Sequence, residues 1–242
     1  MPGDHFDKKT SPNLTDQAIL ITGGIGAEII KELLKHNLGY IIFPGCNAKS
    51  AEAVTKRVQK AAPTAAITFI ACDLASLASV KAAADKILAD LSHLDIFMAN
   101  AGIMSKPAGF TGFRAGQFHF DRLKTTMEGP MGRGLRYSNS KLANILYVRE
   151  LAKRYPKLLA FSLTPGVVGT SLVSDLTLTD RIMIYASQLG RVRTPEQGSF
   201  NHLWAISSPR DSIKRGPFYE PVGKVSKIET THTKDPELPG KL

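Results

Sequence analysis

The first part of the chain alternates between two patterns of apolar residues. Short, continuously apolar runs, such as AILI at 18–21 and IFMA at 96–99, have the length and composition of buried strands. Between them lie longer segments in which apolar residues recur every three or four positions, as in amphipathic helices. The pattern predicts strands over 17–22, 39–43, 66–71 and 94–99, and helices over 27–36, 48–62 and 77–91. Such alternation is typical of a doubly wound parallel sheet with helices on both faces.

The alternation stops at residue 103. Residues 103–134 are rich in glycine and contain no helix or strand pattern of the earlier quality. A structureless stretch of this length is unusual inside a compact domain. Beyond it, the pattern predicts helices over 135–155, 180–189 and 195–206, strands over 158–163 and 216–219, and an irregular polar tail from about 223. We find no internal repeat or linker and therefore predict a single domain over residues 1–242.

The composition adds little to this picture. The chain has 242 residues, 43% of them hydrophobic and 21% charged, which suits a globular domain with a sizeable core. The formal net charge is +10 at pH 7, but Lys and Arg are spread along the whole chain. This distribution is typical of a solvated basic surface, and no interleaving of basic and aromatic residues indicates nucleic-acid binding. We expect no nucleic-acid partner.

Cysteine content and the N-terminal segment bear on location. Cys46 and Cys72 are too few for a disulfide framework and have no metal-ligand spacing. The N-terminal segment is polar with early acidic residues, unlike a signal peptide, and no apolar run approaches the length of a membrane helix. We therefore expect a cytoplasmic protein with reduced cysteines, no bound metal and no membrane contact.

A glycine-rich turn follows the first predicted strand. Residues 21–28 read ITGGIGAE, so Gly23, Gly24 and Gly26 lie between a strand pattern and a helix pattern. Strand, glycine turn and helix is the layout in which the phosphates of a dinucleotide meet the N–H groups at a helix N-terminus. This turn is shorter than such turns usually are, and a tight structural turn is the alternative interpretation.

A second candidate lies on the helix predicted over 135–155, where Tyr137 precedes Lys141 by four positions. Residues four apart project from the same face of a helix. An ammonium group beside a tyrosine favours the phenolate and lowers the tyrosine pKa, so the phenol becomes usable as a general acid or base. A tyrosine and a lysine at this spacing also occur by chance, so the pair gains meaning only from the other motifs.

Taken in order along the chain, several short segments resemble the motifs of the short-chain dehydrogenase/reductase family, and most closely its retinol-dehydrogenase-like members common in fungi. The segments are TGGIG at 22–26, DL at 73–74, NAG at 100–102, YSNSK at 137–141 and PGVVGT at 165–170. Each motif is weak alone, and their shared order is specific. The resemblance covers about 18–222 apart from 103–134, and it implies a Rossmann-like α/β fold and a nicotinamide cofactor.

The resemblance also implies a role for each matching residue. Tyr137 matches the proton donor to the substrate carbonyl, and Lys141 matches the residue that holds the nicotinamide ribose and tunes this tyrosine. The implied cofactor-binding residues are Gly23, Gly24, Ile25, Gly26, Asn47, Asp73, Leu74, Asn100, Ala101, Gly102, Tyr137, Lys141, Pro165, Gly166, Val168 and Thr170. Structural interpretations stay open for the isolated motifs: Asp73 could cap a turn, and Asn100 could mark the end of a strand.

Two departures from the family pattern indicate internal deletions. The family's glycine turn has further residues between its second and third glycines, whereas Ile25 alone separates Gly24 from Gly26. The family also has a helix and a central strand, carrying an active-site asparagine and serine, in the space filled here by 103–134. No serine in that segment follows an apolar run, so we assign no equivalent. Either the fourth predicted strand pairs directly with 158–163, or the fold is compromised.

The residues after the second predicted strand bear on the choice of cofactor. An acidic residue there would bind the ribose hydroxyls of NAD and repel the extra phosphate of NADP. The sequence reads FPGCN at 43–47, without an acid, which favours NADP, and Lys49 could contact the phosphate. We therefore predict an NADP-dependent oxidoreductase acting on a small carbonyl or alcohol, with a homo-oligomer left open. The alternative is a family member without redox activity, serving as a binding or dimerisation module or as a cyclase or isomerase.

Overall fold

The computed structural model describes residues 14–23, 26–33, 39–101, 132–169, 192–227 and 238. Contacts divide the chain into two compact units. The N-terminal unit is Asp7–Gly102, and the C-terminal unit is Ile103–Leu242 together with Met1–Phe6. The expectation of a single domain stays a prediction.

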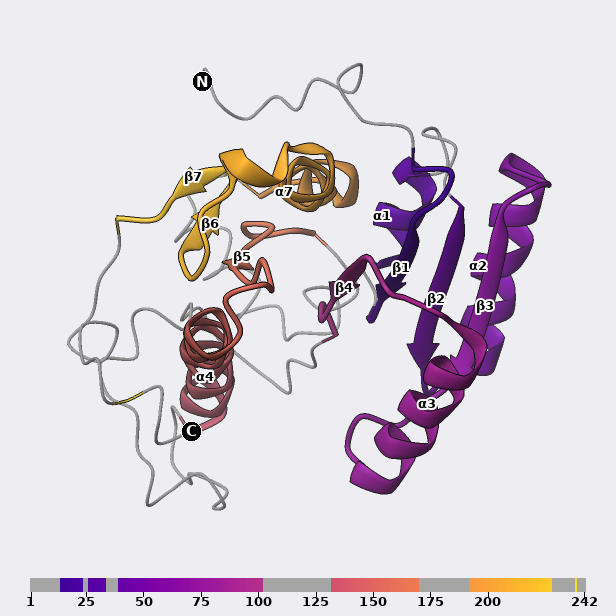
Figure 1. Cartoon of the computed structure of the whole chain (residues 1–242), viewed down its shortest axis with the longest axis horizontal. Coiled ribbons are helices and arrows are strands. Elements are labelled where there is room, and N and C mark those ends of the chain that lie inside the picture. The colour runs from indigo at the N-terminus through magenta and orange to yellow at the C-terminus, as the bar shows by residue number, and fades with distance from the viewer. Residues whose placement is uncertain are drawn as a thin grey trace. The chain divides into compact units, whose positions relative to one another are not determined.

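The N-terminal unit is a parallel sheet with three helices (Figure 1). Its strands are β1 (Ala18–Ile21), β2 (Tyr40–Gly45), β3 (Ala66–Ala71) and β4 (Ile96–Met98), in the order β3-β2-β1-β4. All three pairings are parallel, and the register places Ile19 beside both Ile41 and Ile96. The helices are α1 (Gly26–Leu33), α2 (Ala48–Ala61) and α3 (Leu77–Asp90).

The strand order determines which face each helix covers. The chain moves outward from β1 to β2 and β3, and then returns across the sheet to β4. Because crossovers between parallel strands are right-handed, α1 and α2 cover one face and α3 covers the other. The core agrees: Leu20, Ile42 and Ile70 pack with Ala83 of α3 on one face. On the opposite face, α1 and α2 contact each other.

The sequence pattern located every element of the N-terminal unit, with ends that differ by a few residues at most. Asn47 and Ser76 begin α2 and α3, because each side chain accepts a hydrogen bond from a backbone N–H three residues further on. β1 is apolar throughout because it is central and covered on both faces, and all four of its residues are buried.

The described residues of the C-terminal unit form two long helices and a small sheet (Figure 1). Its elements are α4 (Gly132–Arg154), β5 (Ser162–Leu163), α7 (Pro195–Ser207), the 3₁₀ turn η4 (Arg210–Ser212), β6 (Phe218–Glu220) and β7 (Lys224–Val225). Strand β6 pairs with β5 in parallel and with β7 in antiparallel orientation. The rings of Phe161, Trp204 and Tyr219 pack together, with centroids 4.9–6.5 Å apart. No helix in the described ranges is both long and apolar enough to span a bilayer.

The structure differs from the sequence-based expectations at two places in this unit. The expectation of an irregular tail from 223 is wrong for its first residues, because Lys224 and Val225 pair with the free edge of β6. The strand predicted over 158–163 shortens to β5, which pairs with β6. Among the described residues, β4 and β5 therefore belong to different sheets. The predicted helix over 180–189 lies outside the described residues.

Candidate cofactor-binding and active site

The carboxyl ends of β1 and β4 mark the point of the N-terminal sheet at which the strand order reverses. In open parallel sheets, ligands bind outside the carboxyl ends of the strands at such a reversal. The predicted phosphate turn follows β1, and the predicted pair Asn100 and Ala101 follows β4. The topology therefore brings these two predicted cofactor-binding segments to neighbouring strand ends.

Thr22 joins these two strand ends by hydrogen bonds. Its Oγ1 accepts from the backbone N–H of Asn100 at 3.1 Å and from that of Ala101 at 2.9 Å. Asn100 Nδ2 donates to the Thr22 carbonyl at 2.9 Å, and Thr22 N donates to the Met98 carbonyl at 3.1 Å. The buried hydroxyl thus satisfies two backbone donors that lie beyond the last paired residues of the sheet. Asn100 therefore supports the end of the sheet.

Gly23 is required by the close approach of the chain after β4. Its φ is 89°, in the left-handed region that favours glycine. A Cβ at this position would lie 2.5 Å from Ala101 Cα, so no larger residue fits without moving the backbone. Helix α1 begins at Gly26, soon after this turn, and the first N–H groups of a helix have no partner within it. Glycine at the turn and the first N–H groups of α1 fit a phosphate-bearing cofactor.

The other predicted cofactor residues of the N-terminal unit have structural roles of their own. Asn47 Oδ1 caps α2 by accepting from the N–H of Ser50 at 2.9 Å. Asp73 Oδ1 accepts from the N–H of Ala75 at 2.9 Å, so this carboxylate does cap the turn before α3. The side chain of Leu74 is exposed. Their contacts with a cofactor stay predictions.

Tyr137 and Lys141 lie about one turn apart on α4. Burial lowers the pKa of the Lys141 ammonium below its usual value, because desolvation disfavours the charged form. Leu142, Ile145 and Leu146 follow on the same helix and are buried, so α4 is anchored directly beyond Lys141. The side chain of Tyr137 lies outside the described residues, and its interaction with Lys141 stays a prediction.

The loop that carries PGVVGT follows β5 and begins at Thr164, and the resemblance implies that it meets the nicotinamide of the cofactor. Gly166 has a φ of 79°, and its N–H donates to Thr164 Oγ1 at 3.1 Å. A Cβ on Gly166 would lie 2.8 Å from Arg193 Nε, so the arginine side chain packs against this glycine. Arg193 N donates to the Val167 carbonyl at 2.8 Å, and the Arg193 carbonyl accepts from Gly169 N at 3.0 Å. Arg193, just before α7, therefore fixes the backbone of this loop by hydrogen bonds and packs against Gly166.

Four predicted cofactor residues lie outside the described residues: Gly24, Ile25, Gly102 and Thr170. Sequence reasoning in turn overlooked Thr22 and Arg193, which contact predicted residues, and Asn201, which bonds Thr164 directly before Pro165. Thr22 had a usable signal, because a hydroxyl at the end of a buried strand is well placed to bond the neighbouring backbone. Arg193 and Asn201 had none, because they are distant in sequence from the loop they contact.

A separate hollow of about 620 Å³ lies near the end of α4 and contains none of the predicted site residues. Its lining residues are Arg149, Ala152, Lys153, Asp211, Ile213, Lys214, Arg215 and Gly216. Basic side chains at a helix C-terminus stabilise the negative end of its dipole, and Lys153 lies in the last turn of α4. Arg215 also donates to the Pro156 carbonyl just beyond this helix. The helix end thus accounts for part of the positive charge of this hollow.

Comparison with known proteins bears on the family. The sequence model of the family described as short chain dehydrogenase matches residues 17–128. This match and the relatives below support a member of the short-chain dehydrogenase/reductase family. A short-chain dehydrogenase/reductase of Armillaria gallica is 26% identical over 284 positions, covering 96% of this chain and 89% of that protein. Retinol dehydrogenase 11 of Mus musculus is 27% identical over 254 positions, covering 85% of this chain and 78% of that protein.

Structural comparison supports the same family fold. An NADPH dependent reductase involved in bacilysin biosynthesis has a TM-score of 0.63 at 15% identity, covering 86% of this chain and 99% of that protein. The predicted α/β fold with a parallel sheet is confirmed. The Armillaria alignment spans 284 positions, more than the 242 residues of this chain, so the relative contains residues that this chain lacks. Internal deletions would produce this difference. Members of the family are dehydrogenases or reductases that generally use NAD or NADP.

Proposed function

We propose that this chain is an NADP-dependent oxidoreductase that moves a hydride between the nicotinamide and a small carbonyl or alcohol. The observation that supports the proposal best is the position of Tyr137 and Lys141, one turn apart on α4, with burial lowering the pKa of the lysine. A partly desolvated ammonium interacts more strongly with a neighbouring phenol than a solvated one does. Lys141 would therefore lower the pKa of Tyr137 and prepare it for proton transfer.

The residues then divide the work of cofactor binding and proton transfer. Gly23 and the N–H groups at the start of α1 would bind the cofactor's phosphates, and Lys141 would bind the nicotinamide ribose. When bound there, NADPH would supply a hydride for the carbonyl carbon of the substrate. Tyr137 Oη donates its proton to the carbonyl oxygen, so an alcohol forms and a phenolate remains. Solvent returns the proton to the phenolate, and oxidation of an alcohol runs the same steps in reverse.

The preference for NADP rests on the end of β2. This strand ends at Gly45, followed by Cys46 and Asn47, so no carboxylate stands there to repel the 2′-phosphate. Lys49, in the first turn of α2, is exposed and could pair with that phosphate. A substrate of small-molecule size and a cytoplasmic location belong to the same proposal and rest on the sequence.

The second candidate is a family member without redox activity. Asn47 and Asp73 already cap a helix and a turn. The glycine turn is also short, and no residue is assigned as the active-site serine of the family. Losing one preorganised donor to a developing oxyanion slows catalysis by about 100- to 1,000-fold. In this case the chain would bind the cofactor without converting a substrate.

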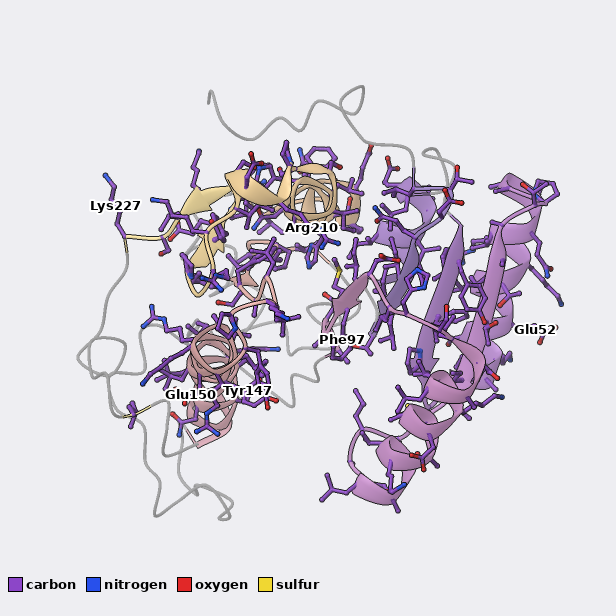
Figure 2. The ribbon with its side chains drawn as sticks, in the orientation of Figure 1. Glu52, Phe97, Tyr147, Glu150, Arg210 and Lys227 are labelled. Atoms are coloured by element: carbon purple, nitrogen blue, oxygen red, sulfur yellow. The ribbon has the colours of Figure 1, made fainter. Side chains whose placement is uncertain are left out.

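The test combines binding with turnover. NADPH and NADH are titrated by calorimetry, and a panel of ketones, aldehydes and alcohols is then assayed by absorbance of the reduced nicotinamide. We expect Tyr137→Phe to lower kcat by about 100- to 10,000-fold and to leave NADPH affinity nearly unchanged. The matched control is Tyr147→Phe, because Tyr147 lies exposed on the same helix (Figure 2). NADPH binding without turnover supports the second candidate, and no binding at millimolar NADPH contradicts the proposal.

A further inference from the structure

Asn201 is a fully buried amide in the middle of α7 that bonds three separate segments of the C-terminal unit. Its Nδ2 donates to the Thr164 carbonyl at 2.8 Å, where the predicted nicotinamide loop begins. The same nitrogen donates to the Tyr219 carbonyl in β6 at 3.2 Å. Its Oδ1 accepts from the N–H of Gly223, in the turn between β6 and β7, at 3.0 Å.

These bonds use both donor hydrogens and the acceptor of the amide. Two carbonyl oxygens face the nitrogen, and one N–H faces the oxygen, so the amide has one orientation that satisfies all three partners. A buried amide without partners is costly, whereas a fully satisfied one specifies the geometry of the groups around it. Asn201 therefore holds Thr164, Tyr219 and Gly223 at a defined separation.

Two further contacts connect this part of α7 to the loop after β5 and to the turn between β6 and β7. A Cβ on Gly198 would lie 2.6 Å from Val168 Cγ2, so Val168 packs directly on the α7 backbone. On the other side, a Cβ on Gly223 would lie 2.4 Å from Trp204 Cε2, so the turn between β6 and β7 packs on the indole. The two turns of α7 between Gly198 and Trp204 thus contact both the loop after β5 and the turn after β6.

We infer that Asn201 is a positioning residue that sets the conformation of the loop Thr164–Gly169 for binding the nicotinamide end of the cofactor. The inference rests on the proposed function for the identity of the ligand. Asn201 acts through Thr164, because the Thr164 backbone leads directly into Pro165 and Gly166. Loss of the amide frees the start of the loop, so cofactor must then order the loop on binding, and its affinity falls.

The matched pair for the test is Asn201→Ala and Ser199→Ala. Ser199 is equally buried on α7, but its Oγ donates at 2.7 Å only to the Glu196 carbonyl of the same helix. We expect Asn201→Ala to weaken NADPH binding by about 10- to 100-fold, with kcat at saturating NADPH reduced far less. Ser199→Ala leaves the NADPH affinity within about twofold, although it also loses a buried hydrogen bond. Equal affinities in the two variants overturn the inference.

A readout without cofactor separates this inference from the proposed function. Hydrogen exchange of the Gly166 and Gly169 amides, which bond Thr164 Oγ1 and the Arg193 carbonyl, reports the order of the loop directly. We expect exchange about tenfold faster in Asn201→Ala than in Ser199→Ala. If the wild type does not bind NADPH, the proposed function fails. Hydrogen exchange of the Gly166 and Gly169 amides then still tests whether Asn201 orders the loop. Unchanged exchange in Asn201→Ala overturns the inference.

An isosteric variant covers the case in which Asn201→Ala does not fold. In Asn201→Asp the acceptor for Gly223 remains, but near pH 8 a carboxylate faces the carbonyl oxygens of Thr164 and Tyr219. Near pH 5, a protonated carboxyl donates one hydrogen bond to these carbonyls. We expect loop protection in Asn201→Asp, relative to wild type at the same pH, to recover at the lower pH. A packing role alone would show no such recovery, and its absence contradicts the inference.

Discussion

The two units hold their predicted cofactor-binding segments in different ways. In the N-terminal unit, β1 and β4 pair in parallel through backbone hydrogen bonds as far as Ile21 and Met98. Beyond these residues, the Thr22 hydroxyl accepts hydrogen bonds from the backbone N–H groups of Asn100 and Ala101. In the C-terminal unit, β5 and β7 have only two residues each, and a side-chain amide connects three segments. The comparison teaches that where strands are short, hydrogen bonds from individual buried side chains connect the segments. Where strands are longer, backbone hydrogen bonds between paired strands make that connection.

Helices α2 and α3 of the N-terminal unit differ from α7 in the same sense, although α1 also buries Glu32. The buried residues of α2 and α3 are Ala51, Val58 and Ala83, all apolar. Helix α7 instead buries Ser199, Asn201 and His202 beside Leu203. Apolar faces tolerate changes of similar volume, whereas each buried polar group depends on its own partners. We therefore expect the C-terminal unit to respond to pH and to polar substitutions more strongly than the N-terminal unit.

The largest expected effect is that of Gly23→Val in the N-terminal unit. The new side chain would meet Ala101 Cα, and the φ of 89° would strain any β-branched residue. We expect the free energy of unfolding to fall by about 3–4 kcal/mol, measured by denaturant titration. The control is Gly45→Ala, because the nearest atom to a Cβ there is Phe69 Cε2 at 3.6 Å. Equal losses in both variants would show that backbone approach is not the cause.

Thr22→Val tests the hydroxyl that extends the backbone pairing of β1 and β4. Valine has nearly the shape of threonine, but it leaves the N–H groups of Asn100 and Ala101 without their acceptor. We expect unfolding free energy to fall by about 2–3 kcal/mol, measured by denaturant titration. Thr22→Ser keeps the hydroxyl and should recover most of this loss. A neutral Thr22→Val would mean that the backbone ladder alone joins the two strand ends.

The N-terminal unit was largely predictable from the sequence, for a physical reason. Its helices and strands are each specified by a short stretch of sequence, because apolar runs form strands and periodic segments form helices. Asn47 and Ser76 cap the first turns of α2 and α3. Strand order and the faces covered by α1, α2 and α3 follow from the handedness of crossovers. The position of Gly23 at the strand reversal could be inferred from the same rules.

The C-terminal unit was predictable only in part, because its organising contacts are distant in sequence. Nothing near Asn201 indicates that it bonds Thr164, and nothing near Arg193 indicates that it packs on Gly166. The pairing of Lys224 and Val225 with β6 was missed, because a two-residue strand carries no alternation that could be recognised. Chain-distant side-chain contacts must be observed in the structure.

His202 gives the C-terminal unit a predicted sensitivity to acid. Burial lowers the pKa of its imidazole to about 4, and a backbone hydrogen bond with Gly198 offsets only part of this effect. The unfolded chain binds a proton near pH 6.5, so stability is complete above that pH and falls as the pH drops toward 4. We expect His202 to lower the free energy of unfolding by about 2 kcal/mol between about pH 7 and pH 5.

The corresponding experiment is denaturant unfolding of wild type and His202→Gln across this pH range. Glutamine stays neutral, so we expect the variant to lose about 2 kcal/mol less than wild type on acidification. His93→Gln is the control, because His93 is exposed in the N-terminal unit. A pH dependence that His202→Gln leaves unchanged would remove the proposed difference between the units.

The smallest expected effects come from one surface ion pair in each unit. Lys81 and Asp85 on α3 are both exposed, and the lysine precedes the acid, which is the weaker arrangement along a helix. Lys81→Ala should therefore change unfolding free energy by about 0.5 kcal/mol or less. On α4, Glu150 (labelled in Figure 2) precedes Arg154 and is mostly buried. Its Oε1 lies 2.6 Å from Arg154 Nε. We expect Arg154→Ala to cost more than Lys81→Ala, because it leaves a mostly buried carboxylate without its partner. Thermal unfolding at low and high salt tests this order: salt should abolish the effect of Lys81→Ala and only reduce that of Arg154→Ala.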